Sequence, residues 1–400
     1  MFERVFGPIG ISTSDLTWRN NAYRPREING IKRREFGSGI SANVDARAGK
    51  SLNKARNSNY KSIEPFIGPI VLSATKKGGR GAAPYPPSPV IKRIEWAPAD
   101  TIIRRASGSD NWPITWADDD NLYTAYGDGW GFEPKTKKKL SLGIAKIVGS
   151  PPDFRGVNIR TDSGERIGQG AKGAKTSGIL CVDGVLYMLV RNTGNSQLAW
   201  SRDYGKNWKW CDWKFTTSFG APTFLNFGKN YAGARDGFVY IYSHDSDSAY
   251  EPADRMVMAR VPKDRIIKRD AYEFFKGLDD WRQPIWTRGI HEMRAVFINP
   301  GRCYRAGITY NPGLKRYLWC QTIYGEDDMR FKGGIGIFDA PEPWGPWTTV
   351  YYTEEWDVGP GETSSLPTKW MSNDGKTCYL LFSGDDCFSV RRGVFNINDN

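Results

Sequence analysis

The stretch Cys181–Val190 reads CVDGVLYMLV and places an Asp-Gly dipeptide directly before an apolar run that contains a tyrosine. Asp-Gly supplies the backbone angles of a tight hairpin turn, and the residues after it have the β-branched and aromatic composition of a strand. The same unit, a turn followed within a few residues by a tyrosine in an apolar run, occurs five times. The turns are Asp119-Asp120-Asn121, Asp183-Gly184, Asp236-Gly237, Pro312-Gly313 and Asp374-Gly375.

The spacing of these turns indicates the architecture. The mean spacing between successive turns is about 64 residues, which fits one four-stranded antiparallel sheet with long loops in each repeat. The sequence therefore predicts an all-β fold, a five-bladed β-propeller. The last repeat ends near Phe395 after its third strand, so the ring needs an outer strand from elsewhere, and Val90–Ala106 is predicted to supply it. The longer third interval predicts an inserted helix over Pro262–Asp279, where apolar residues have roughly helical spacing.

The composition agrees with many short strands. Aromatic residues make up 14% of the chain, and it has 44 Gly and 24 Pro. With 39% hydrophobic residues, the chain can bury a sizeable core, which excludes full disorder, collagen and coiled coil. No apolar run approaches the length that spans a bilayer. The N-terminus opens with no signal peptide, so we expect a cytoplasmic protein as made, particle-associated or released, and extracellular if a leader is missing.

Positive charge is concentrated at the N-terminus. The formal net charge is +12, and the first 90 residues carry 15 Lys or Arg against 6 Asp or Glu. Residues 1–89 are therefore predicted to be a basic, irregular N-terminal arm that precedes the propeller, residues 90–400. The arm is either a solvated tail or an anchoring segment that docks on a larger assembly, such as a virion, or on an acidic surface. It has no recognisable nucleic-acid-binding module, so nucleic acid is not the expected partner.

Cysteine and histidine usage gives no sign of a metal centre. The six cysteines form no CxxC pair, and there are only two histidines, so no zinc site is expected. The cysteines are expected to be buried thiols, and disulfides, which the spacing cannot pair, stay possible. No cofactor is expected to be required, and a structural metal ion is left open.

A second local motif supports the propeller. Ser201–Trp208, SRDYGKNW, has the pattern S-x-D-x-G-x-x-W and resembles the Asp-box of sialidase-like propellers. The resemblance implies a structural role for four residues in a turn between strands: Ser201, Asp203, Gly205 and Trp208. The carboxylate would cap turn amides, the glycine would allow the bend, and the tryptophan would pack between sheets.

Site residues can be nominated from position alone. In an antiparallel blade the start of the first strand and the end of the second lie on one rim, so these positions from all blades surround one funnel, where ligands bind. The predicted catalytic residues are Asp110, Asp128 and Glu362. The predicted substrate-binding residues are Trp112, Lys175, Arg191, His244, Tyr304, Arg305 and Asp385.

Carboxylates gathered on one wall are what glycoside hydrolysis requires, one protonated and one ionised. We expect Asp128 to be the general acid, because Trp130 and Phe132 flank it, and Asp110 to be the base or nucleophile, with Glu362 assisting. Each residue also has a structural interpretation. Either aspartate could cap a turn, His244 could be a buried structural histidine, and Trp112 could pack between blades.

Three stretches also point to a family. Asp110–Phe132 (DNWPITWADDDNLYTAYGDGWGF), Ala259–Ile266 with the following AYEFF, and Ser383–Val390 (SGDDCFSV) resemble a bacterial and phage family of five-bladed propellers that includes endo-D-arabinanases. The resemblance covers about residues 110–395. It implies that Asp110 and Asp128, at the two ends of the first hairpin, carry catalysis.

Three functions follow as alternatives. The first is a glycoside hydrolase acting on a polysaccharide or glycan, for example a virion- or surface-associated depolymerase. The second is a polysaccharide lyase that cleaves uronates by β-elimination, with His244 or Tyr304 as base and an arginine neutralising the uronate. The third is a non-catalytic glycan-binding or structural propeller, because a fold by itself does not determine function.

Overall fold

The computed structural model describes residues 83–325 and 327–398, all within the compact unit Lys61–Asn400. Most of the predicted arm, residues 1–82, lies outside the described residues. The described chain is all-β, as predicted, and has 23 strands. Its helices are single 3-10 turns, at Ala99–Thr101, Gly170–Lys172, Lys229–Tyr231, Arg269–Ala271, Ile290–Glu292, Thr368–Trp370 and Gly384–Asp386. Among the described residues, none of these turns has the length and apolar character to cross a membrane.

The strands form antiparallel groups in chain order. The first is β3 (Ile114–Trp116), β4 (Leu122–Tyr126), β5 (Gly143–Val148) and β6 (Arg155–Ile159). The second is β7 (Lys175–Val182), β8 (Val185–Arg191), β9 (Ser196–Ser201) and β10 (Lys209–Phe215). The third is β11 (Thr223–Asn226), β12 (Phe238–His244), β13 (Ala253–Pro262), β14 (Glu273–Leu278) and β15 (Pro284–Thr287), with β16 (Phe297–Cys303) also paired to β13. The fourth is β17 (Ala306–Asn311), β18 (Arg316–Ile323), β19 (Gly334–Ala340) and β20 (Thr348–Thr353). The last is β21 (Ser364–Ser365), β22 (Thr377–Phe382) and β23 (Phe388–Ile397), joined by β1 (Ile91–Trp96) and β2 (Ile103–Arg105).

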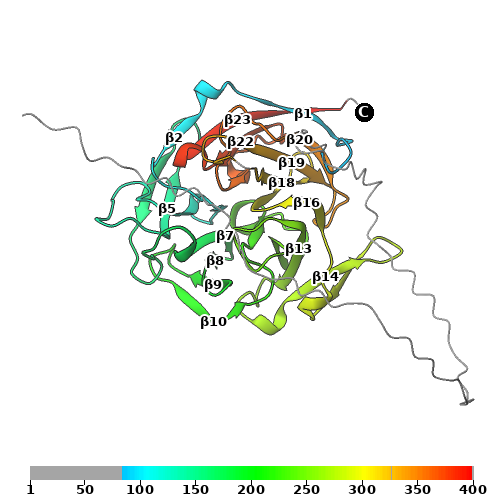
Figure 1. Ribbon diagram of the computed structural model, residues 1–400, viewed down its shortest axis with the longest axis horizontal. Coiled ribbons are helices and arrows are strands. Elements are labelled where there is room, and N and C mark those ends of the chain that lie inside the picture. The colour runs from blue at the N-terminus through cyan, green and yellow to red at the C-terminus, as the bar shows by residue number, and fades with distance from the viewer. Residues whose placement is uncertain (1–82, 326, 399–400) are drawn as a thin grey trace, which may run out of the picture. The chain divides into compact units, whose positions relative to one another are not determined.

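The groups follow one another around a common centre in Figure 1, and within the second group β7 to β10 run in order from the middle of the view to its edge. The third and fourth groups are joined into one sheet by a short parallel pairing of β11 with β17. No sheet in the described residues closes on itself.

Each of the five repeated turns lies between the first and second strand of a group, as the sequence predicts. The turn between β7 and β8 shows why the dipeptide matters. Asp183 and Gly184 both have positive φ, 49° and 74°, which is the backbone of the two-residue hairpin turn that matches strand twist. The turn dipeptides therefore set the first hairpin of each group.

The N-terminal segment completes the last group. β1 pairs with β23 along its length, and Ile94 lies opposite Phe395. Ile91 and Ile94 are buried in the core that this group shares with the fourth. Tyr85, just before β1, is also held, because its hydroxyl oxygen accepts a hydrogen bond from the Ile298 amide at 2.7 Å. The predicted outer strand is thus observed as part of the last sheet.

Two truncations test the importance of this pairing. A chain beginning at residue 83 keeps β1, β2 and the Tyr85 contact, and we expect it to melt cooperatively near the temperature of the full chain. A chain beginning at residue 107 exposes the edge of β23 and the apolar face that β1 covers, and we expect it to lose the cooperative transition. Calorimetry or circular dichroism measures both. Similar melting of the two truncated chains would contradict the structural role of β1.

The predicted inserted helix is wrong. Half of Pro262–Asp279 lies in β14 and a preceding 3-10 turn, and β14 pairs antiparallel with β13 and β15. Phe274 and Phe275 are both buried although they are consecutive. Consecutive residues of a strand point to opposite faces, so a strand with both faces covered buries both rings, which a one-sided helix would not.

The turn Ser201–Trp208 has the hydrogen bonds expected of its motif. The Asp203 carboxylate accepts from the Asn207 amide at 2.9 Å, and Ser201 Oγ accepts from the Gly205 amide at 2.9 Å. Gly205 has φ 85°, and the Trp208 indole donates to the Gly205 carbonyl at 2.9 Å while its ring is buried. These contacts fit a structural role. All six cysteines are buried free thiols, as expected.

Candidate active site

The first hairpin brings Asp110 and Asp128 to one rim. Asp110 and Gly127 form an isolated antiparallel bridge with reciprocal backbone hydrogen bonds of 3.0 and 2.7 Å, one residue before Asp128. Asn111 and Asp128 both have positive φ, 60° and 39°, which turns the chain at the two ends of the bridge. A Cβ on Gly127 would lie 2.6 Å from Asp110 Oδ1, so only glycine leaves room for that carboxyl group.

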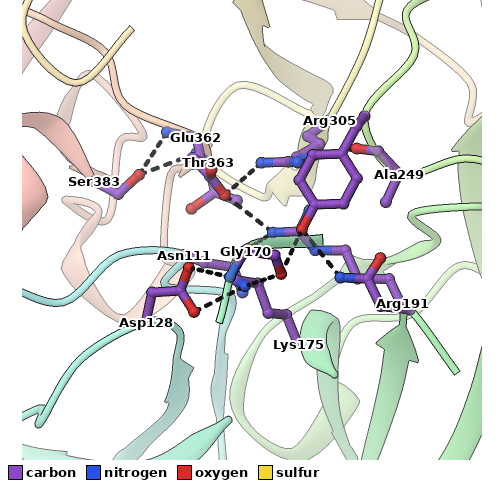
Figure 2. A network of polar contacts seen from close by, with 12 residues as sticks. Asn111, Asp128, Gly170, Lys175, Arg191, Ala249, Arg305, Glu362, Thr363 and Ser383 are labelled. Atoms are coloured by element: carbon purple, nitrogen blue, oxygen red, sulfur yellow. Dashed lines mark hydrogen bonds and ion pairs between the residues drawn. The ribbon is translucent and has the colours of Figure 1, made fainter. Parts of the chain in front are cut away.

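Asp128 is held as an ion pair. Lys175 Nζ lies 2.9 Å from Asp128 Oδ1, and the Gly170 amide donates to Asp128 Oδ2 at 3.1 Å. The lysine ammonium is almost fully buried and also donates to the Gly170 carbonyl at 2.8 Å. The start of β7 and the 3-10 turn before it therefore fix the Asp128 side chain, and Figure 2 shows these contacts.

Glu362 is held by two arginines from other groups. Its Oε2 accepts from Arg191 Nη2 at 3.0 Å and also from Arg305 Nη1. Arg191 ends β8 and Arg305 precedes β17, and both guanidiniums are buried. The backbone amide of Glu362 donates to Ser383 Oγ at 2.7 Å, which positions the residue from the end of β22 (Figure 2).

A tyrosine links the two halves of this cluster. The Tyr250 ring lies 5.3 Å from the Arg191 guanidinium and 5.0 Å from that of Arg305. Its hydroxyl donates to the Gly170 carbonyl at 3.2 Å and accepts from Asn192 at 3.0 Å. Tyr250 thus connects the arginines that hold Glu362 to the turn that holds Asp128.

The surroundings of Asp110 and Glu362 shift the pKa values of these two carboxyl groups in opposite directions. Burial raises the pKa of Asp110, to about 8, and the charges of Glu362 and Asp128 add to that shift. Burial also acts to raise the pKa of Glu362, but the charges of Arg305, Arg191 and Lys175 outweigh it and lower that pKa. The cluster therefore holds a protonated acid beside an ionised carboxylate at neutral pH, which is the division of roles that acid–base chemistry needs.

Several polar atoms in the cluster point at no protein partner. Asp110 Oδ1 and the Nε and Nη1 of Arg191 are buried without a hydrogen bond in the described structure. Arg191 is fully buried, so leaving two of its donors unpaired is costly. A ligand oxygen would satisfy these groups, and we interpret them as the place where substrate binds.

The other predicted site residues differ in their burial and in their contacts. His244 is completely buried, its Nε2 lies 2.7 Å from the Ser248 carbonyl, and burial lowers its pKa to about 4. Tyr304 is buried beside it, with ring centroids 5.8 Å apart. Trp112 is buried among Tyr126, Phe132 and Phe388, which places its indole in the core between groups. Asp385 pairs with Arg104 at 2.6 Å.

Four contributors were not predicted from the sequence: Asn111, Gly170, Tyr250 and Ser383. Asn111 follows Asp110 directly, and its Oδ1 lies 3.4 Å from Arg191 Nη2. Ser383 follows β22, where the rule for rim positions applies, so that rule could have found it. Gly170 and Tyr250 lie in long loops whose position no strand pattern indicates.

Within residues 83–325 and 327–398, no group of three or more His, Cys, Asp or Glu side chains is placed to hold a metal ion.

Comparison with known proteins identifies a family. The family model described as "Domain of unknown function (DUF4185)" matches residues 180–384. No curated protein matches the chain.

Solved structures give distant likenesses. A putative hydrolase from Bacteroides ovatus ATCC 8483 is 13% identical, with 75% of this chain and 93% of that chain covered and a TM-score of 0.45. A GH43_1 enzyme from Xanthomonas citri is 13% identical, with 76% and 95% covered and a TM-score of 0.42. The structure titled RS223-Beta-xylosidase is 13% identical, with 74% and 98% covered and a TM-score of 0.42. At this low identity and TM-score, these structures do not show what this chain does.

Proposed function

The chain belongs to the DUF4185 family, and from its site we propose that it is a glycoside hydrolase that cleaves a polysaccharide or glycan by carboxylate acid–base catalysis. The observation that carries the proposal is the pair of opposed environments. Asp110 is buried with a raised pKa, and Asp128, at the other end of the same hairpin, is ion-paired to Lys175 of β7.

The environments favour a different division of roles from the one that the sequence suggested. Burial favours the neutral form of Asp110, so Asp110 is the better general acid. Asp128 is held in place by the buried Lys175 ammonium, 2.9 Å from its Oδ1, which positions it as the second carboxyl group. The sequence argument assumed that Trp130 and Phe132 desolvate Asp128, but the Trp130 residue is 37% exposed and the Phe132 ring packs against Trp112.

In this mechanism the glycosidic oxygen lies next to Asp110. Asp110 donates its proton to that oxygen as the bond to the anomeric carbon breaks. The Asp128 carboxylate either removes a proton from water that adds to the anomeric carbon or attacks that carbon itself. Arg191 offers its two unpaired donors to sugar oxygens, and Glu362 keeps Arg191 and Arg305 in place and balances their charge.

We further infer that the five antiparallel groups are the blades of a five-bladed propeller. Two observations support this: the repeated turns occupy the same place in each group, and the candidate site draws residues from the rim positions of four groups. A propeller brings such positions into one funnel, which explains how residues so far apart in the chain meet. Docking of the basic arm on a virion or another assembly stays part of the proposal.

The lyase alternative is less well supported by the site. Its proposed bases are His244 and Tyr304. His244 Nε2 is held by the Ser248 carbonyl, and burial raises the pKa of Tyr304, so its hydroxyl stays protonated at neutral pH. A base for β-elimination must accept a proton from the substrate, which a protonated phenol does poorly.

A product screen tests the assignment. We expect the full chain to release reducing ends from at least one polymer in a panel that includes arabinan and uronate polymers. A hydrolase adds water and leaves no chromophore, whereas a lyase leaves a conjugated unsaturated uronate that absorbs in the ultraviolet. New ultraviolet absorbance with each cleavage would contradict the hydrolase and favour the lyase. Binding without any cleavage across the panel would favour the non-catalytic alternative.

A further inference from the structure

Two exposed aromatic side chains lie beside the candidate active site, outside the catalytic cluster. Trp130 is 37% exposed and Phe331 is 61% exposed. Both belong to loops at the ends of second strands, Trp130 after β4 and Phe331 after β18. Exposed aromatic rings offer flat apolar faces on which a ligand can pack.

A chain of contacts joins the two aromatics through the charged pair Asp386 and Arg330. The indole of Trp130 lies over Gly108, since a Cβ there would meet the ring at 3.9 Å. The amides of Gly108 and Ser109 donate to the Asp386 carbonyl at 2.8 and 2.9 Å. The Asp386 carboxylate pairs with Arg330 at 3.1 Å.

The same contacts continue to Phe331. The Arg330 guanidinium lies 5.3 Å from the centre of the Phe331 ring, and its other side pairs with Asp328 at 2.6 Å. Trp130, Asp386, Arg330 and Phe331 therefore form one strip, which we call the rim strip. It has an aromatic ring at each end and a charged pair between them.

The rim strip adjoins the catalytic cluster. The amide of Gly361, next to Glu362, donates to the Met329 carbonyl at 2.8 Å, and the Asp385 amide donates to the Arg330 carbonyl at 2.9 Å. Glu362 is also close enough that its charge adds to burial in raising the pKa of Asp386. The loop that carries Arg330 and Phe331 is thus docked directly against the segment that carries Glu362.

The chemistry of the strip fits a sugar chain. Sugar rings have apolar faces that pack on aromatic rings and hydroxyls at their edges that bond to charged side chains. Arg330 and Asp328 are both 47% exposed at the side chain, so they keep access to a ligand. We propose that the rim strip binds further sugar units of the polysaccharide beside the bond that is cleaved, an inference that rests on the proposed function.

The test separates binding from turnover. The double variant Trp130→Ala/Phe331→Ala is compared with the wild type by affinity gel electrophoresis in soluble arabinan, xylan and polygalacturonate. Trp281→Ala is the matched control, because Trp281 is 81% exposed in the turn between β14 and β15, outside the strip. We expect the double variant to bind the retarding polymer roughly tenfold more weakly and the control to bind like the wild type.

Kinetics provide a second readout. For the polymer that is cleaved, the double variant should have a KM raised about tenfold, with turnover of a short aryl glycoside within roughly twofold of the wild type. Repeating the gel in an Asp110→Asn background measures binding without cleavage, so the rim strip is tested even if the proposed hydrolysis fails. Equal retardation of double variant and wild type, or no retardation of the wild type by any polymer, would overturn the proposal.

Discussion

Asp110→Asn is expected to lower turnover of an ordinary glycoside by about 10² to 10⁴, the range for loss of a positioned general acid. The amide has no proton acidic enough to give to the leaving oxygen, while its size preserves the packing over Gly127. An aryl glycoside with a good leaving group needs little protonation, so its cleavage should suffer much less. Steady-state kinetics on the two substrates measures the difference.

Asp128→Asn separates the roles of the two carboxyl groups. It should lower turnover by a similar factor of about 10² to 10⁴ on both substrates, because water activation or attack on the sugar is needed whatever the leaving group. Asp203→Asn serves as the control, since it should reduce stability with kcat little changed in the folded fraction. If both site variants keep near wild-type activity, the hydrolase assignment fails.

The pH profile provides an independent check on Asp110. The general acid acts only when protonated, so activity should persist through neutral pH and fall as the pH rises through about 8, where Asp110 loses its proton. Asp110→Asn should keep some residual activity. If that activity still falls at the same alkaline pH, a group other than Asp110 causes the fall.

Stability should follow the same titration. The folded-state pKa of Asp110 lies above its unfolded value, so its contribution to stability is complete below the unfolded pKa and is lost as the pH rises through the folded one. Asp110→Asn cannot ionise, so its melting temperature relative to the wild type should rise from about pH 4 to about 8 and level off above that. Thermal melts across that range measure the difference, and a pH-independent difference would contradict the raised pKa.

Glu362→Gln is expected to damage both stability and activity. The substitution leaves the buried guanidiniums of Arg191 and Arg305 without their counter-charge. Breaking a fully buried pair costs about 3–5 kcal/mol, and because the Glu362 side chain is 25% exposed we expect a smaller loss, about 1–3 kcal/mol. Turnover should fall as well, since Arg191 would no longer be held against the substrate.

The same variant should also move the pH profile. The Glu362 charge contributes to the raised pKa of Asp110, so its removal should shift the alkaline limb of activity to lower pH. Glu95→Gln is the matched control, because Glu95 pairs with Arg93 at the exposed edge of β1 and its loss should change neither property. If Glu362→Gln changes neither the melting temperature nor the pH at which activity falls on the alkaline side, the role given to Glu362 is wrong.

Local features of the chain were readable from the sequence. The five turn dipeptides mark the first hairpin of each group, because the angles of tight turns depend on the residues in them. The same hairpin logic brought Asp110 and Asp128 together, since the two ends of one hairpin are close whatever surrounds them. The prediction from apolar spacing was wrong over Pro262–Asp279. The strand there buries Phe274 and Phe275 in succession, so its apolar residues do not alternate as they do in a strand with one exposed face.

Only the tertiary structure decided the surroundings of the site residues. Lys175 and Arg191 come from the second group, Arg305 precedes the fourth and Glu362 precedes the last, and the contacts between these groups arise from their packing around one centre. Burial of Asp110 and exposure of Trp130 are the reasons why we propose roles for the two aspartates that are opposite to those expected from the sequence. A sequence specifies which residues sit at strand ends through local backbone preferences. Desolvation and charge pairing depend on neighbours that are far away in the chain, so the proton affinity of each carboxyl group is set only when the fold is complete.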